Sequence, residues 1–192
     1  MTRIVAVSDT HMKSDLPKEL VETVKGYDII VHAGDFVTSE IYDQFDSLGW
    51  LEAVFGNSDS PRLKSTLPER LTLEVDGVKI GVVHMPSHSF DLTGAGMMAR
   101  EMEVDVLIFG HLHRPIIDQG KKLLLCPGSP VLPRMSAPSV AEVIIEGGSV
   151  KGRIVPLGAP KCDYLQYAGS LAGTDSAGDG KKKESEGQGS GR

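Results

Sequence analysis

The first half of the chain alternates short apolar runs with amphipathic stretches. Apolar runs at 3–7, 28–32 and 50–55 predict buried strands, because each is short and strongly hydrophobic. The stretches 17–25 and 39–47, which lie between these runs, have the spacing of apolar residues that is typical of helices. Strands that alternate with helices along a chain indicate parallel βαβ units.

The second half is richer in strands. Two apolar runs, 70–75 and 78–83, flank Asp76-Gly77, a dipeptide typical of tight hairpin turns. A helix is expected at 94–102, and further strands at 105–109, 115–119, 122–126, 139–146 and 149–155. The pattern therefore predicts one α/β domain over residues 1–172, in which two sheets pack face to face with helices outside.

The last stretch of the chain has a different composition. Apolar residues almost vanish from Gly173 onward, and Gly, Ser, Lys and Glu dominate, so burial cannot offset the entropy of ordering. Residues 173–192 are predicted to form a disordered tail. Acidic and basic residues balance in this tail, so the body carries the whole net charge of −6. An acidic body argues against stable binding of nucleic acid or of an anionic membrane.

The cysteines and the N-terminal residues indicate the cellular compartment that is expected for the protein. Cys126 and Cys162 lie far apart and form no CxxC pair, which favours buried free thiols over a disulfide. Residues 1–7 lack the pattern of a signal peptide, and no apolar run approaches membrane-spanning length. A cytoplasmic location is the expectation.

Residues that can bind a metal ion follow five of the predicted strands. A single histidine after a strand is usually structural, but ligands after several parallel strands meet at one edge of a sheet. The pattern therefore predicts a shared metal site. Its candidate ligands are Asp9, His11, Asp35, Asn57, His84, His111 and His113.

The types of ligand narrow the choice of metal ion. Imidazoles, carboxylates and one amide without a thiolate disfavour a cysteine-rich structural zinc, and suit Mn²⁺, with Ni²⁺, Zn²⁺, Fe²⁺ and Co²⁺ as alternatives. Seven ligands are too many for one catalytic ion, so two ions that share a carboxylate, about 3.5–4 Å apart, are expected. Two such ions leave the site net positive, which favours a phosphorylated substrate.

These residues resemble the signature of the calcineurin-like metallophosphoesterase superfamily. The resemblance covers about residues 3–155 and is carried by Asp9-x-His11, Gly34-Asp35, Gly56-Asn57, His84 and Gly110-His111-x-His113. Length and spacing are most similar to the small single-domain prokaryotic phosphodiesterases of this superfamily, the YfcE type. The resemblance implies a four-layer α/β/β/α sandwich and phosphodiester hydrolysis by a hydroxide that bridges two metal ions.

The resemblance also implies a division of the ligands. One metal would take Asp9, His11, Asp35 and His113, and the second would take Asp35, Asn57, His84 and His111. Asp35 would therefore bridge the two ions.

The chain departs from the superfamily pattern beside Asn57. Many members have a histidine at the next position that can protonate the leaving group, whereas this chain has Ser58. Asp59 is a candidate catalytic residue that would orient His11, with a turn cap as the alternative. His88 is a second candidate, as a proton donor, with an exposed surface histidine as the alternative.

Two other functions each match part of the sequence pattern. The retromer scaffold subunit has this fold and serves chiefly as a binding protein, but its metal set is degraded, whereas every ligand position is filled here. The segment 94–99 matches the dinucleotide fingerprint G-x-G-x-x-A, but it lies ten residues beyond the preceding strand, so a helix start is favoured. The oligomeric state, including a homo-oligomer, stays open.

Overall fold

Three parallel strands form one half of the first sheet. In this sheet the strand order is β10-β9-β1-β2-β3, with β1 parallel to β2 and β2 parallel to β3. β9 and β10 extend the sheet by antiparallel pairing. The strands are β1 (Thr2–Val7), β2 (Ile29–His32), β3 (Leu51–Ala53), β9 (Ser139–Glu146) and β10 (Ser149–Pro156). The computed structural model describes residues 1–87 and 92–160, so the predicted tail and His88 lie outside the described residues.

The second sheet is also mixed. Its order is β4-β5-β6-β8-β7, with β5, β6 and β8 parallel to one another and an antiparallel strand at each edge. The strands are β4 (Arg70–Val75), β5 (Val78–Val83), β6 (Val106–Phe109), β7 (Pro115–Gln119) and β8 (Leu123–Pro127). The hairpin predicted around Asp76-Gly77 is confirmed, since Val75 pairs with Val78.

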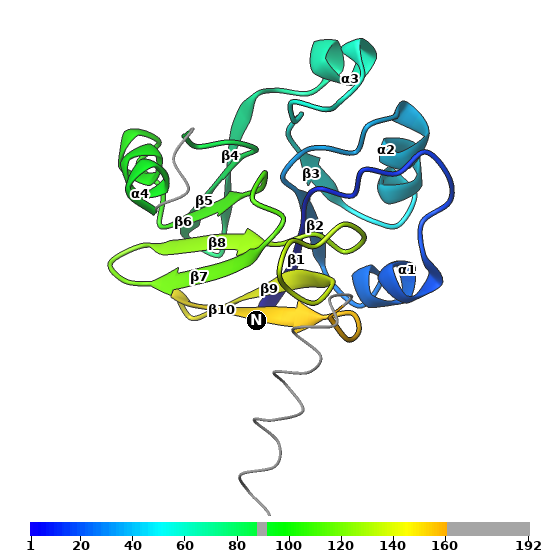
Figure 1. Ribbon diagram of the computed structural model, residues 1–192. Coiled ribbons are helices and arrows are strands. Elements are labelled where there is room, and N and C mark those ends of the chain that lie inside the picture. The colour runs from blue at the N-terminus through cyan, green and yellow to red at the C-terminus, as the bar shows by residue number, and fades with distance from the viewer. Residues whose placement is uncertain (88–91, 161–192) are drawn as a thin grey trace, which may run out of the picture.

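The helices cover the outer faces of the two sheets (Figure 1). α1 (Lys18–Val24) and α2 (Ser39–Asp46) lie on the first sheet, and α4 (Leu92–Glu101) lies on the second. Alternate residues of β1 show the layering. Ile4 and Ala6 belong to the core between the sheets, whereas Val5 and Val7 pack with the helices. The predicted four-layer sandwich of two mixed sheets flanked by helices is confirmed.

One short helix was not predicted. α3 (Pro61–Thr66) follows β3 and begins with a cap, because the Ser60 hydroxyl accepts a hydrogen bond from the backbone N–H of Leu63. Ser60-Pro61 is a recognisable start signal, a capping serine before a proline at the first helical position. The helix is too short for a clear apolar period. None of the helices in the described part of the chain is long and apolar enough to cross a membrane.

A buried carboxylate ties β9 to two other strands. Glu142 is fully buried, and its carboxylate accepts hydrogen bonds from Arg3 at 2.7 and 3.1 Å and from Arg153. Burial alone raises the pKa of Glu142, but the two guanidinium groups outweigh it and lower that pKa. The ion pairs therefore stabilise the fold whenever Glu142 is ionised.

We expect Glu142→Gln to lower the free energy of unfolding by about 1–3 kcal/mol at pH 7. The pKa of Glu142 is lower in the folded than in the unfolded state. The difference between wild type and variant is therefore complete above the unfolded pKa, about 4.3, and shrinks as pH falls through the folded value. Urea unfolding at several pH values measures this difference. Glu146→Gln, an exposed glutamate of the same strand, is the control, and an equal effect of both variants would contradict the ion-pair account.

Candidate metal centre

Loops after five strands converge at one edge of the sandwich. Asp9 and His11 follow β1, Asp35 follows β2, and Asn57 follows β3. His84 follows β5, and the pair His111 and His113 follows β6. The parallel strands β1, β2 and β3 and their counterparts β5 and β6 all end here, which is why residues far apart in sequence meet. The structure brings all seven predicted ligands together in two groups.

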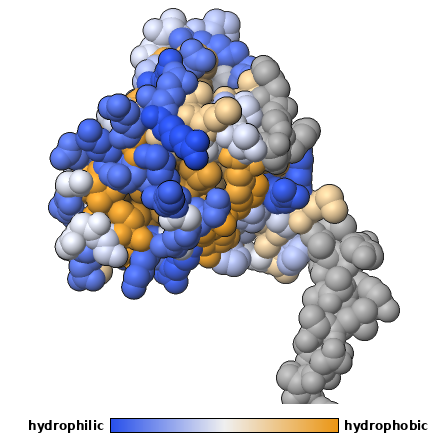
Figure 2. Space-filling view, turned by 90° about the vertical axis from the view of Figure 1, so that its left-hand side faces the viewer, coloured by the Kyte–Doolittle hydropathy of each residue, from blue (hydrophilic) through white to orange (hydrophobic). Residues whose placement is uncertain are grey.

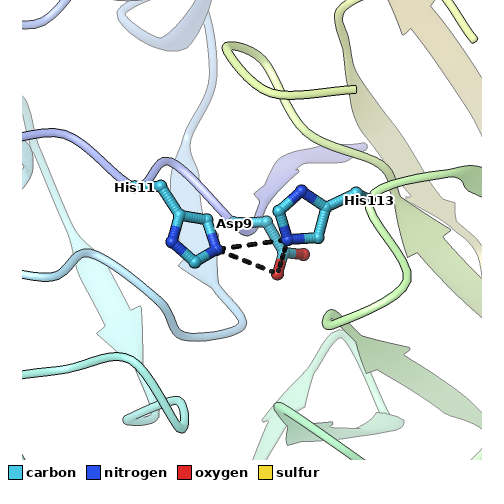
Figure 3. Close-up of side chains that lie close together, drawn as sticks. All are labelled: Asp9, His11 and His113. Atoms are coloured by element: carbon cyan, nitrogen blue, oxygen red, sulfur yellow. Dashed lines mark hydrogen bonds and ion pairs between the residues drawn. The ribbon is translucent and has the colours of Figure 1, made fainter. Parts of the chain in front are cut away.

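The first group contains Asp9, His11 and His113 (Figure 3). The Nε2 atoms of His11 and His113 lie 3.2 Å apart. Asp9 Oδ1 lies 3.4 Å from the Nε2 of His113 and 3.9 Å from that of His11. Three potential ligand atoms thus face one small space, to which Asp35 Oδ2 is added, 3.2 Å from His11 Nε2.

The second group surrounds the side-chain oxygen of Asn57. Asn57 Oδ1 lies 3.0 Å from His84 Nε2 and 3.0 Å from His111 Nδ1. Asp35 Oδ2 lies 3.4 Å from His84 Nε2. The same carboxylate oxygen therefore contacts a histidine from each group, and it stands between them.

Backbone carbonyls orient two of the histidines. His84 Nδ1 lies 2.8 Å from the carbonyl oxygen of Ala33, and His113 Nδ1 lies 2.8 Å from that of Leu132. A carbonyl can only accept, so each ring carries a hydrogen on Nδ1, and the neutral ring presents the lone pair of Nε2 to the centre. This tautomer is the one a metal ligand requires, and the donor set therefore fits a divalent cation.

The ligand loops adopt an unusual backbone conformation. Five of the seven predicted ligands are non-glycine residues in the left-handed region, which costs about 1 kcal/mol or more each. Their φ angles are 54° at Asp9, 45° at His11, 62° at Asp35, 73° at His111 and 54° at His113. Such strain gathers at functional sites, where the surrounding structure enforces it.

A close approach of two loops explains the glycine before Asn57. A Cβ atom on Gly56 would lie 2.1 Å from Asp35 Oδ1, so no side chain fits there. The backbone N–H of Ser58 donates to the same oxygen, at 2.7 Å. Oδ1 is therefore held by the protein, and Oδ2 is left for the centre.

The electrostatics of the centre favour a cation. Burial raises the pKa of the Asp35 carboxyl, but His11 and His84, which can donate Nε2–H to it when their rings are protonated, outweigh burial and hold that pKa well below its usual range. The hydrogen bond to Asp35 is in turn the main cause that raises the pKa of His11. Asp35 is thus ionised at neutral pH, and its negative charge lies where the two groups meet.

Asp59 lies behind the ligands. Its Oδ2 accepts hydrogen bonds from the backbone N–H groups of Gly56, at 2.7 Å, and Asp35, at 3.1 Å, while Oδ1 accepts from Val37, at 2.6 Å. The carboxylate thereby joins the loops after β2 and β3. This arrangement favours the turn-cap interpretation, and a catalytic role for Asp59 stays a prediction. The other catalytic candidate, His88, lies outside the described residues.

Two buried serines donate hydrogen bonds to Asp9. Ser8 Oγ donates to Asp9 Oδ2 at 2.7 Å, and Ser129 Oγ donates to the Asp9 carbonyl oxygen at 2.7 Å. Ser129 Oγ also accepts from the backbone N–H of Leu132, whose carbonyl orients His113. In the sequence, Cys126-Pro127-Gly128-Ser129 is typical of a plain turn, and the family resemblance implies a pocket-lining role for Ser129 as the alternative. Its position in the Cys126–Ser129 turn gave no sign that it links two ligands.

Cys126 plays no part in the centre. It is a buried free cysteine, as predicted, and burial raises the pKa of its thiol to about 12. The thiol is therefore protonated at neutral pH, which suits neither a metal ligand nor a nucleophile. Cys162 lies outside the described residues.

Comparisons with known proteins identify the family of the chain. The calcineurin-like phosphoesterase superfamily domain matches residues 2–148. The chain belongs to the calcineurin-like phosphoesterase superfamily. A probable metallophosphoesterase from Methanothermobacter thermautotrophicus is 32% identical over 169 residues, which cover 85% of this chain and 98% of that protein.

Two solved structures are similar to the fold. A predicted phosphoesterase from Streptococcus pneumoniae has a TM-score of 0.62 and 28% identity, and the match covers 81% of this chain and 90% of that one. Vps29 from Entamoeba histolytica, in a complex with Zn²⁺, has a TM-score of 0.65 and 22% identity, with coverage of 81% and 99%. The second similarity shows the shared fold alone.

We expect Asp59→Asn to weaken both the fold and the centre. The new amide group would place a donor against backbone donors, which costs about 1–3 kcal/mol of unfolding free energy. The loops that carry Asp35 and Asn57 would loosen, and Mn²⁺ affinity should fall about 10-fold or more. Urea unfolding and titration calorimetry measure the two effects. Asp43→Asn, on the exposed face of α2, is the control. Unchanged Mn²⁺ affinity in Asp59→Asn would contradict the positioning role.

Proposed function

We propose that this protein is a phosphodiesterase that uses two divalent metal ions, with manganese as the expected metal. The contact of one carboxylate oxygen with both ligand groups carries the proposal. Asp35 Oδ2 lies 3.2 Å from His11 Nε2 and 3.4 Å from His84 Nε2, so it can reach an ion in either group. Membership of the phosphoesterase superfamily supports a hydrolytic reaction.

Each ion would be held by its own set of ligands, and the two sets would share Asp35. Asp9, His11 and His113 would hold one ion, Asn57, His84 and His111 would hold the other, and Asp35 would bridge them. When bound, two divalent ions polarise a phosphoryl group and make hydroxide available near neutral pH. The protein itself keeps the ligands rigid and presents their lone pairs. No side chain needs to act as the nucleophile.

Charge and space favour a small phosphodiester. Two divalent ions outweigh the charges of Asp9, Asp35 and one hydroxide by about one unit, so an anionic phosphate is attracted although the chain is acidic. A cavity of about 110 Å³ adjoins the second ligand group. Asn57 and His84 line it together with Phe55, Glu69 and Met85. A small ester group fits this cavity, and larger groups would extend over the open surface.

Ser58 leaves the leaving group without a strong proton donor. Its hydroxyl accepts a hydrogen bond from Asn57 Nδ2 at 3.1 Å, which helps to present Asn57 Oδ1 to the centre. A serine hydroxyl is too weak an acid to protonate an alkoxide at neutral pH. We therefore propose that the enzyme prefers esters whose alcohol is already a good leaving group.

We expect hydrolysis of bis-p-nitrophenyl phosphate to disappear in EDTA and to return with Mn²⁺. Asn57→Ala removes an oxygen that two histidines of the second group contact, so kcat/KM should fall at least about 10-fold. Gln119→Ala, which truncates an exposed amide on β7, is the control. Bound metal without any turnover of diester or monoester would contradict the enzyme and favour the scaffold function.

Ser58→His tests the missing proton donor. We expect the variant to gain at least about 10-fold in kcat on alkyl esters of phenyl phosphate, because general acid catalysis helps poor leaving groups most. Turnover of bis-p-nitrophenyl phosphate should change little. Ser58→Gln, which has similar bulk and no titratable proton, is the control. An equal gain on both substrates, or an equal gain in both variants, would argue against the account.

A further inference from the structure

A groove away from the metal centre runs between α4 and the turn that joins β7 to β8. Its volume is about 440 Å³, within the range of small-molecule sites, which is about 300–1,000 Å³. None of the seven predicted metal ligands lines it. Figure 2 views the molecule from the side on which α4 and this turn lie, and it shows apolar surface in the hollows between hydrophilic residues.

One part of the groove is apolar. Leu92 and Met97 contribute from α4 and Leu124 contributes from β8. Met97 is 65% exposed, although it is a large apolar side chain. Gly96 leaves the space open, because a Cβ atom there would meet only Leu124 Cδ1, at 4.0 Å. Gly96, the second glycine of the 94–99 segment, therefore keeps this part of the groove free of a side chain, a role unrelated to a dinucleotide fingerprint.

The other part of the groove is basic. Arg100 lies in the last turn of α4, and Lys121 and Lys122 lie in the turn opposite, while Asp118 is the one acidic residue in the lining. Lys122 is held in place because its ammonium group donates to the carbonyl of Val104. Arg100 and Lys121 take part in no ion pair within residues 1–87 and 92–160. In a chain of net charge −6, this lining is a local region of positive charge.

We propose that this groove binds a small amphipathic anion, namely a planar aromatic ring that carries a phosphate group. The ring would lie over Gly96 against Met97 and Leu124, since a thioether makes favourable contacts with aromatic rings. The phosphate would lie between Arg100 and Lys121, because a guanidinium group binds phosphate with two parallel hydrogen bonds. This site is independent of the proposed hydrolysis.

Binding of AMP to the full-length, metal-loaded protein tests the proposal by titration calorimetry. We expect AMP to bind more tightly than adenosine, which lacks the anion, and more tightly than inorganic phosphate, which lacks the ring. Gly96→Leu should weaken AMP binding at least about 10-fold, because its side chain fills the groove. The variant should unfold at the same or a higher temperature, since leucine is a better helix former than glycine.

Arg100→Gln is the second variant, and it changes no buried group. We expect AMP binding to weaken about 5-fold and to depend less on salt, as for a charge at the rim of a site. Arg62→Gln, an exposed arginine on α3, is the control. AMP that does not bind, or that binds both groove variants as tightly as wild type, would overturn the proposal. If AMP binds both groove variants as tightly as wild type, its site would be the metal centre, and Asn57→Ala would then lose AMP binding.

Discussion

Lone pairs of oxygen and nitrogen that point toward one another are the constraint on which the rest of this structure depends. Asp35 Oδ2, Asp9 Oδ1 and Asn57 Oδ1 converge with the ring nitrogens of four histidines. Carbonyl groups accept from the other nitrogen of His84 and of His113, so each of these rings, when neutral, presents a lone pair to the centre. Such a set of acceptors repels itself unless cations stand between its members. The two packed sheets hold these ligand atoms together.

The scaffold holds the ligands at a measurable energetic cost. Left-handed backbone at five ligand residues is unfavourable in isolation. Hydrogen bonds around the centre compensate for this cost. Asp59 accepts from backbone N–H groups of the loops after β2 and β3. Ser129 donates to the Asp9 carbonyl and accepts from the N–H of Leu132. The central strands β1 and β6 are fully buried over their last four residues, so the ends of these strands move little. Strain is thus confined to the loops, while the strands that feed them are firmly packed.

The sequence predicted most of this from two regularities. Short runs with apolar residues predicted every strand, because most of the strands have a buried face, and residues able to bind a metal marked where five of the runs end at the site. β3 is shorter than expected, since only Leu51, Glu52 and Ala53 pair with β2. α3 was missed because six residues are too few to show a helical period. The supporting contacts were harder to predict, since the carbonyls of Ala33 and Leu132 act through the backbone and leave no trace in residue type.

Anomalous diffraction from crystals of the protein grown with Mn²⁺ tests the central claim most directly. The account predicts two manganese peaks about 3.5–4 Å apart. One peak should lie among Asp9, His11 and His113, the other among Asn57, His84 and His111, and both should be within bonding distance of Asp35 Oδ2. A single peak, or two peaks that do not share Asp35, would contradict it.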